Sequence, residues 1–224
     1  MPQLSFDVMT LSMKFGKATV RDLKYLTRLV KRAKAQNCSI LIPRMQDKSE
    51  WKILVFADAA HSNLMDEEGN EKTASTQGKL VLWVGERGKC FPITWGANKC
   101  HRVCRSPVAA ETLAAMDGLE EGILSRHFLE VVLDLDPKII KLIGVTDSRP
   151  LDVASHNTVT ISDRKMRIDM AAMREGIARE EIYILWRRAG IMLADVFTKK
   201  GVNALQLVTL VRTGSLPEEI KMIQ

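Results

Sequence analysis

Four acidic side chains stand out because of their neighbours in the sequence. Asp58 and Asp147 each directly follow an apolar, strand-like stretch, whereas Glu111 and Asp195 lie among Ala, Leu, Val and Phe residues. Unpaired carboxylates in apolar surroundings are unfavourable, so their convergence is explained if a cation compensates them. Oxygen ligands without His or Cys favour Mg²⁺ or Mn²⁺ over zinc. The alternative is that these four are caps and surface acids, since the chain holds 27 acidic residues.

The stretches before Asp58 and Asp147 predict strands over residues 51–57 and 138–146. If the strands are parallel neighbours, their carboxyl ends bring the two Asp side chains together. Between them, residues 78–84 and 90–95 predict a β-hairpin. The Ser-Pro pair at 106–107 predicts the start of a helix that reaches about residue 126 and carries Glu111 one turn in.

The remaining elements complete an α/β pattern. Residues 149–156 and 162–178 predict helices, 181–187 a last strand, and 193–200 a helix that carries Asp195. This order predicts a mixed sheet with helices packed on it. We divide the chain into a basic helical segment over 1–47, a central domain over 48–201 and a helical tail over 202–224.

The positive charge is concentrated at the start of the chain. The whole chain has a formal charge of +6, but residues 1–46 carry nine Lys and Arg against two Asp, which is +7. Such a charge asymmetry is typical of a segment that binds along a polyanion. The alternative is a solvated helix face. Residues 19–35 predict an amphipathic helix capped by Thr19. Its apolar positions, which we expect to pack on a neighbour, are Leu23, Leu26, Leu29, Val30 and Ala33.

Composition excludes several classes of protein. With 46% hydrophobic and 27% charged residues, the chain is globular rather than disordered, and no apolar stretch approaches the roughly 20 residues that span a bilayer. The first residues lack the pattern of a secretory signal, so we expect an intracellular protein. The Cys100-His101-x-x-Cys104 run, with Cys90 as a third thiolate, suggests zinc. However, it has no second matching pair, and we favour reduced thiols.

Six short motifs carry a resemblance to a known family. They are Phe56–Ala59, Ser75–Gly78, Ile93–Trp95, Ser106–Ala114, Val145–Ser148 and Leu193–Lys199. In this order they resemble the ribonuclease H domain of copia-type retrotransposon reverse transcriptases. The resemblance covers roughly residues 51–201, and the Ala-Asp-Val-Phe-Thr-Lys run is its most specific part. Residues 4–35 are more loosely similar to the polymerase thumb and its connection.

The resemblance implies a ribonuclease H-like fold, with a mixed five-stranded sheet, and hydrolysis of the RNA strand of RNA–DNA hybrids. Asp58, Glu111, Asp147 and Asp195 match the catalytic carboxylates, which hold two Mg²⁺ ions, with Mn²⁺ as a substitute. The expected partners are the hybrid and the polymerase part of a reverse transcriptase. Candidate contacts to the hybrid backbone are Arg105, Ser106, Arg164, Lys165 and Arg167.

The chain also departs from the family pattern. No His lies between His156 and Asp195, where cellular relatives place a mobile one, and Thr112 replaces the usual aromatic residue after the helix Glu. Neither Tyr25 nor Tyr183 begins the x-Asp-Asp turn of a polymerase, so DNA synthesis is not expected. Two alternatives stay open, a retroelement relic that binds nucleic acid without turnover and an integrase-like polynucleotidyl transferase.

Overall fold

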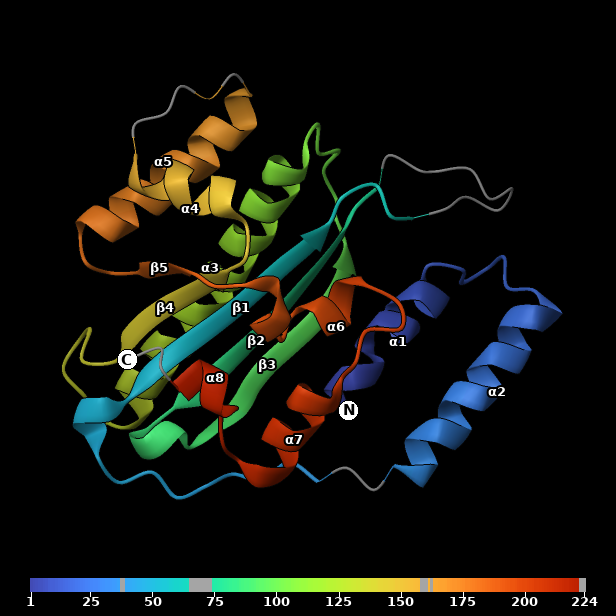
Figure 1. Cartoon of the computed structure of the whole chain (residues 1–224), viewed down its shortest axis with the longest axis horizontal. Helices are drawn as coiled ribbons and strands as arrows, with labels where there is room; N and C mark the ends of the chain where they lie inside the picture. The colour runs from blue at the N-terminus through green and yellow to red at the C-terminus, as the bar shows by residue number, and fades with distance from the viewer. Residues whose placement is uncertain (37–38, 65–73, 158–160, 162, 222–224) are drawn as a thin grey trace.

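The fold is built on one five-stranded sheet (Figure 1). A computed structural model describes residues 1–36, 39–64, 74–157, 161 and 163–221. The strand order is β3-β2-β1-β4-β5. The strands are β1 (Lys52–Ala60), β2 (Thr76–Val84), β3 (Cys90–Lys99), β4 (Lys141–Thr146) and β5 (Tyr183–Trp186).

The sheet is mixed, as the sequence predicts. Strand β1 pairs antiparallel with β2, which pairs antiparallel with β3. On its other side β1 runs parallel to β4, and Phe56 lies opposite Val145. Strand β5 is parallel to β4. The strands that lead to Asp58 and Asp147 are therefore parallel neighbours, which is the condition under which their carboxyl ends bring the two Asp side chains together.

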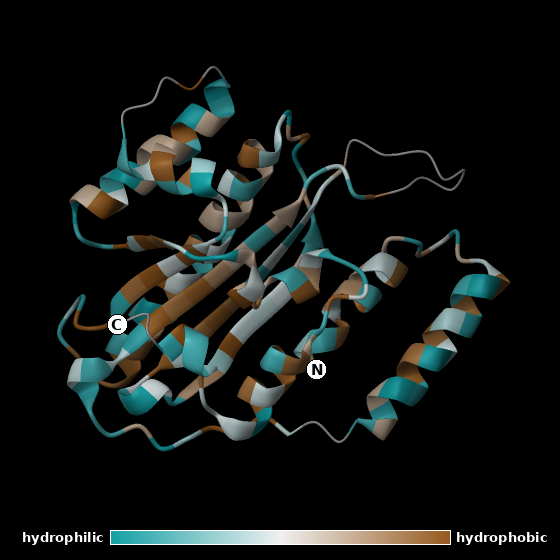
Figure 2. Ribbon diagram, in the orientation of Figure 1, coloured by the Kyte–Doolittle hydropathy of each residue, from teal (hydrophilic) through white to brown (hydrophobic). Residues whose placement is uncertain are grey.

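Helices cover both faces of the sheet. One core cluster joins the sheet to α3 (Pro107–Val132), α4 (Arg149–His156) and α5 (Arg164–Ala178). The other joins it to α6 (Asp195–Thr198), α7 (Leu205–Thr213) and α8 (Glu218–Lys221). Hydrophobic residues run along the central strands between these layers (Figure 2). Burial of apolar surface on both faces of one sheet stabilises this arrangement, and the predicted fold class, a mixed sheet flanked by helices, is confirmed.

Several predicted element ends are wrong. Strand β1 continues through Asp58 to Ala60, because its pairing with β2 extends until Ala60 lies opposite Thr76. Strand β4 begins only at Lys141, since Lys138 has a positive φ of 65° within a turn. The helix predicted over 193–200 is the four-residue α6. The helix predicted from 162 begins at Arg164 with Asp163 as its cap, and position 162 itself lies outside the described residues.

The N-terminal helices show a second difference from expectation. Helix α2 (Val20–Ala35) starts at the predicted Thr19 cap, which forms a capping box with Asp22. Of its apolar positions only Leu29 is buried, whereas Leu23 is 62% exposed. The reason is that α2 rests on α1 (Ser5–Ser12) through polar contacts, including a 2.5 Å hydrogen bond that the Tyr25 hydroxyl donates to Asp7. The contact face is thus rotated away from the predicted stripe.

The two ends of the chain are packed on the central sheet. Leu4 and Met9, from the first turns, are buried, and α1 lies against β3. In the tail, Leu207 and Leu210 of α7 belong to one of the two main core clusters. Among the described residues, each helix is too short or too polar to cross a bilayer.

Candidate functional site: an acidic centre at one end of the sheet

Three of the four predicted carboxylates meet. Asp58 lies near the carboxyl end of β1, Asp147 directly follows β4, and Glu111 lies one turn into α3. One ligand atom from each lies within 4.8 Å of the others. Asp58 is only 1% exposed, and the other two are partly buried. We call this group the acidic centre.

The fourth carboxylate lies beside the acidic centre and is joined to it by a lysine. Asp195, the first residue of α6, accepts a 2.6 Å hydrogen bond at Oδ1 from Lys199 Nζ. The same Nζ lies 3.5 Å from Asp58 Oδ2. The Thr198 hydroxyl also donates a short hydrogen bond to Asp58 Oδ2. Helix α6 and Lys199, which directly follows it, therefore supply one carboxylate, one hydroxyl and one ammonium to this end of the sheet.

The close approach of α6 depends on a glycine. Gly78 lies opposite Asp58 in the β1–β2 pair. A Cβ at this position would lie 2.5 Å from Phe197 Cβ and 3.2 Å from the Ala194 carbonyl oxygen. The end of α6 is fixed as well, because Thr76 Oγ1 donates a 3.1 Å hydrogen bond to the Thr198 carbonyl. Gly78 thus lets the helix rest directly on β2.

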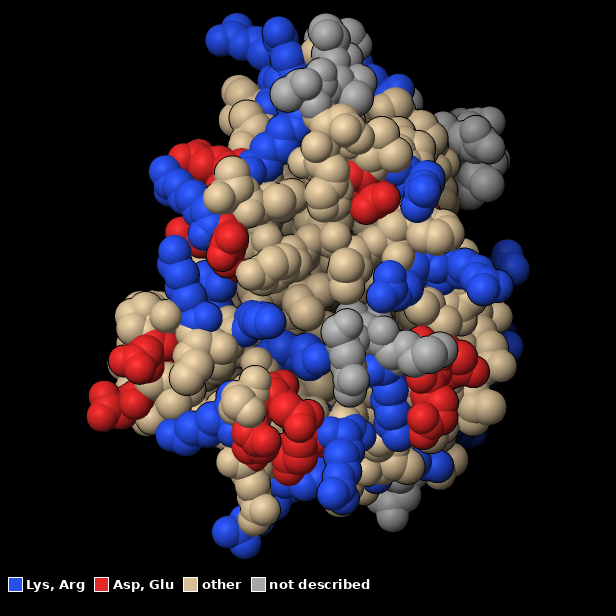
Figure 3. Space-filling model, turned by 60° about the vertical axis from the view of Figure 1, so that its left-hand side comes forward, with Lys and Arg blue, Asp and Glu red and all other residues tan. Residues whose placement is uncertain are grey.

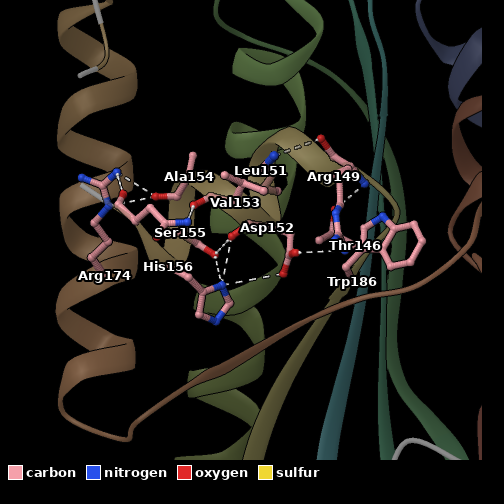
Figure 4. Close-up of polar contacts among 12 residues, drawn as sticks. Thr146, Arg149, Leu151, Asp152, Val153, Ala154, Ser155, His156, Arg174 and Trp186 are labelled. Atoms are coloured by element: carbon pink, nitrogen blue, oxygen red, sulfur yellow. Dashed lines mark hydrogen bonds and ion pairs between the residues drawn. The ribbon is translucent and has the colours of Figure 1, made fainter. Parts of the chain in front are cut away.

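Backbone contacts hold Asp147 in its loop. The Trp186 indole N–H on β5 donates a 3.0 Å hydrogen bond to the Asp147 carbonyl, and the Arg149 guanidinium lies 4.8 Å from the centre of the Trp186 ring. Figure 4 shows Arg149 and Trp186 beside each other, at the start of α4. At the other end of α4, Arg174 of α5 donates two hydrogen bonds of 2.9 and 2.7 Å to the Ala154 carbonyl (Figure 4). The segment after Asp147 is therefore held at both ends.

Burial and mutual repulsion shift the titration of the acidic centre. Burial, together with the charges of Asp58 and Asp147, raises the pKa of Glu111 to about 9. Burial also raises the pKa of Asp58 to about 6, against the opposing effects of the Thr198 hydroxyl and the Lys199 charge. The pKa of Asp147 is raised as well, first by burial and then by the Asp195 charge. Without a compensating cation, the fully ionised centre is unfavourable.

The raised pKa of Glu111 predicts a pH-dependent loss of stability in the metal-free protein. The folded state retains a proton that the unfolded chain releases, so this contribution is full below about pH 4.5 and is lost as the pH rises toward 9. We expect Glu111→Gln to be more stable than wild type at pH 8 by on the order of 1–3 kcal/mol. Urea unfolding in chelator at pH 5, 7 and 9 measures this. Glu120→Gln, an exposed position on the same helix, is the control, and a constant difference across the three pH values would contradict the prediction.

The donor set fits a hard divalent cation. All the converging ligand atoms are carboxylate oxygens, which suit Mg²⁺ or Mn²⁺. Glu111 Oε2 is buried and has no hydrogen-bond partner in the described part of the chain, as expected of an oxygen whose partner is a bound ion. The zinc interpretation gains no support, because Cys90 and Cys100 belong to different core clusters.

The candidate basic residues gather where the loop before α3 meets the start of α5. Arg102 Nη1 lies 2.9 Å from Asp169 Oδ2 of α5. Backbone hydrogen bonds from Met166 and Lys165 lower the pKa of Asp163, and the nearby charge of Arg105 contributes to the same shift. The loop before α3 therefore lies against the first turns of α5.

Four of the five candidate nucleic-acid contacts are exposed in this region, namely Arg105, Arg164, Lys165 and Arg167. We call these four residues the basic cluster. Figure 3 shows Lys and Arg side chains spread over the face that carries α5 and β5, with acidic side chains in separate small groups. Ser106 has a structural role, because its hydroxyl oxygen accepts a 3.2 Å hydrogen bond from the Ala109 N–H and caps α3.

Sequence reasoning missed three side chains that hold the site. Thr198 and Lys199 contact Asp58 directly, and Trp186 fixes the loop of Asp147. The signal for the first two was present, since both belong to the Ala-Asp-Val-Phe-Thr-Lys run. Trp186 had no such signal because its partner is a backbone carbonyl 39 residues away.

Comparison with known proteins gives distant structural likenesses. No protein-family model and no curated protein sequence matches the chain. Among solved structures, it is similar to the N-terminal RNase H domain of a Mycobacterium tuberculosis protein, with 12% identity and a TM-score of 0.44 over 70% of this chain and 96% of that one.

Two further likenesses are of the same kind. RNase H1 from the archaeon Halobacterium salinarum matches with 15% identity and a TM-score of 0.44, over 69% of this chain and 97% of its own. The RNase H domain of prototype foamy virus matches with 12% identity and a TM-score of 0.39, over 74% and 95% of the two chains. Identities this low do not extend the neighbours' activities to this chain.

Proposed function

We propose that this protein is a divalent-metal-dependent endonuclease that hydrolyses the RNA strand of RNA–DNA hybrids. The observation that carries the proposal is the meeting of Asp58, Glu111 and Asp147 within 4.8 Å, with Asp195 beside them. The sequence motifs that contain all four residues support the same activity through their resemblance to ribonuclease H domains.

The four carboxylates would together bind two cations. Asp58, Glu111 and Asp147 would hold one Mg²⁺, and Asp58 and Asp195 a second, with Mn²⁺ as a substitute. Such a pair of ions activates the attacking water and stabilises the leaving oxygen of the RNA phosphate. Thr198 acts as a positioning residue, since its hydroxyl fixes the orientation of the Asp58 carboxylate. Trp186 does the same for the backbone of Asp147.

The basic cluster supplies the attraction for a double-stranded polyanion. Lys and Arg side chains contact phosphates without reading sequence, so the cluster would place the hybrid rather than select a base sequence. Choice of the RNA strand requires contacts to 2′-hydroxyl groups. We assign the cluster to backbone contacts and the acidic centre to cleavage.

We also propose that the chain is part of a retroelement reverse transcriptase of the copia type. The Leu193–Lys199 motif supports it most, and residues 1–47 fit a remnant of the polymerase thumb and connection in their basic, helical character. The polymerase part would then be a partner. The alternative, an inactive relic, shares the fold and the basic cluster and differs only in turnover.

The proposal is tested with a labelled RNA–DNA hybrid and a matched DNA duplex. We expect cleavage of the RNA strand alone, with Mg²⁺ or Mn²⁺, and its loss when EDTA is added. Hybrid binding without cleavage under all metal conditions would favour the relic. Strand transfer into the DNA duplex would favour the integrase-like alternative.

The basic cluster makes a separate prediction about binding. Replacing Arg164, Lys165 and Arg167 with Gln is expected to weaken hybrid binding about tenfold or more and to reduce the slope of log K against log salt by about 2–3. Fluorescence anisotropy at several salt concentrations measures both. The control carries Gln at Lys48, Arg87 and Lys141, which lie at the end of the sheet where β1 and β4 begin, away from the acidic centre. Equal losses in the two triple variants would refute a localised binding surface.

A further inference from the structure

The Lys199 ammonium lies inside the acidic site, where a bound cation would be expected. Its Nζ lies 2.6 Å from Asp195 Oδ1 and 3.5 Å from Asp58 Oδ2, so the ammonium sits between the two carboxylates. The first pair alone would be an ordinary helical ion pair of residues i and i+4, which contributes little. The second pair is different, because Asp58 is 1% exposed and belongs to the acidic centre.

The charges around Lys199 strengthen this placement. Burial alone would lower the pKa of Lys199, but the hydrogen bond to Asp195 and the charges of Asp58, Asp195 and Asp147 outweigh burial and raise it. The ammonium is therefore a permanent positive charge at neutral pH. Its side chain is 42% exposed, so withdrawal toward solvent requires no unfolding of the surrounding core.

The acidic site consequently has two unequal halves. Asp58, Glu111 and Asp147 converge, and in the described part of the chain neither Glu111 nor Asp147 forms an ion pair with a Lys or Arg side chain. Between Asp58 and Asp195, by contrast, a cation belonging to the protein is already in place. Two positive charges at that position exclude each other, so a divalent ion must displace the ammonium.

We propose that Lys199 is an internal competitor for the divalent cation position between Asp58 and Asp195, so that metal ions bind in order, the second only when the ammonium withdraws. This inference rests on the proposed function, because it assumes a metal-binding acidic centre. Lys199 is thus a positioning residue that controls whether the second metal ion can bind. The same ammonium keeps Asp58 and Asp195 compensated whenever the second ion is absent.

The test is Mn²⁺ binding to the full chain without substrate, followed by electron paramagnetic resonance of the free ion and by calorimetry. We expect wild type to bind one ion more tightly than the other. In Lys199→Met, the affinity for the second ion should rise at least about tenfold relative to that for the first. Lys200→Met, which removes the neighbouring exposed charge, is the matched control and should leave the ratio of the two affinities as in wild type.

The outcomes separate this inference from the function on which it rests. Two ions that bind wild type and Lys199→Met with the same ratio of affinities would overturn the role of Lys199 and leave the metal-dependent nuclease standing. An equal change of the ratio in Lys200→Met would also overturn it, since a general field effect would then suffice. Absence of Mn²⁺ binding in wild type and both variants would overturn the proposed function itself. Thermal unfolding of the metal-free variants confirms that each is folded.

Discussion

Asp58→Asn is expected to abolish cleavage of the RNA strand while hybrid binding is retained. Asp58 is the carboxylate that both halves of the site share, since it lies within the acidic centre and also lies 3.5 Å from the Lys199 ammonium, which pairs with Asp195. An amide has nearly the same shape but carries no charge, so it cannot hold a divalent cation as a carboxylate does. Metal-ion stabilisation of the reaction is worth several kcal/mol, which corresponds to a loss of at least about 1000-fold in rate.

The measurement is the single-turnover rate on a labelled hybrid at saturating Mg²⁺, together with the dissociation constant for the hybrid. Asp134→Asn makes the same chemical change at an exposed position with a positive φ of 50°, a conformation that Asn tolerates well. It should cleave like wild type. Because Asp58 is buried at a raised pKa, Asp58→Asn should also be at least as stable as the metal-free wild type at neutral pH. Retained turnover in Asp58→Asn would falsify the assignment of the acidic centre.

The sequence predicted the acidic centre because local patterns carried enough information. Two apolar runs that each lead to an Asp bring the two acids together if the strands are parallel neighbours, and β1 and β4 are such neighbours. The position of Glu111 was equally predictable from the sequence, because the Ser106 cap and Pro107 fix the start of α3 and hence the turn on which Glu111 lies. The convergence of these three acids therefore followed from two strand ends and a helix start, whereas Asp195 was singled out by its apolar neighbours and the Leu193–Lys199 motif.

What the sequence left open depends on contacts between distant segments. The packed face of α2 was predicted wrongly, because periodicity gives an apolar stripe but not the face that α1 contacts. The length of α6 was wrong for a similar reason, since its four residues end where Thr198 turns toward Asp58. Side-chain roles such as that of Trp186 arise only once the sheet has brought β5 beside β4.

Gly78→Ala is expected to disable the site without touching any carboxylate. The added methyl group would approach Phe197 Cβ to 2.5 Å, and Phe197 is fully buried, so it has no space into which to retreat. Helix α6 must therefore move away from β2. This displaces Asp195, Thr198 and Lys199 from Asp58, and a shift of about 1 Å at a catalytic site costs on the order of 100-fold in rate. Overpacking of this kind also lowers stability by about 1–3 kcal/mol.

Gly96→Ala in the neighbouring strand β3 gives the matched comparison. There the nearest atoms to an added Cβ are Asn98 Nδ2 at 3.7 Å and Lys79 Cε at 3.9 Å, which is ordinary contact. We expect Gly96→Ala to keep the wild-type cleavage rate, with a smaller loss of thermal stability than Gly78→Ala. The first Mn²⁺ site should survive in Gly78→Ala, because Asp58, Glu111 and Asp147 do not lie on α6. If Gly78→Ala cleaves at the wild-type rate, the position of α6 does not control the reaction, and Asp195 and Thr198 lose the roles assigned to them here.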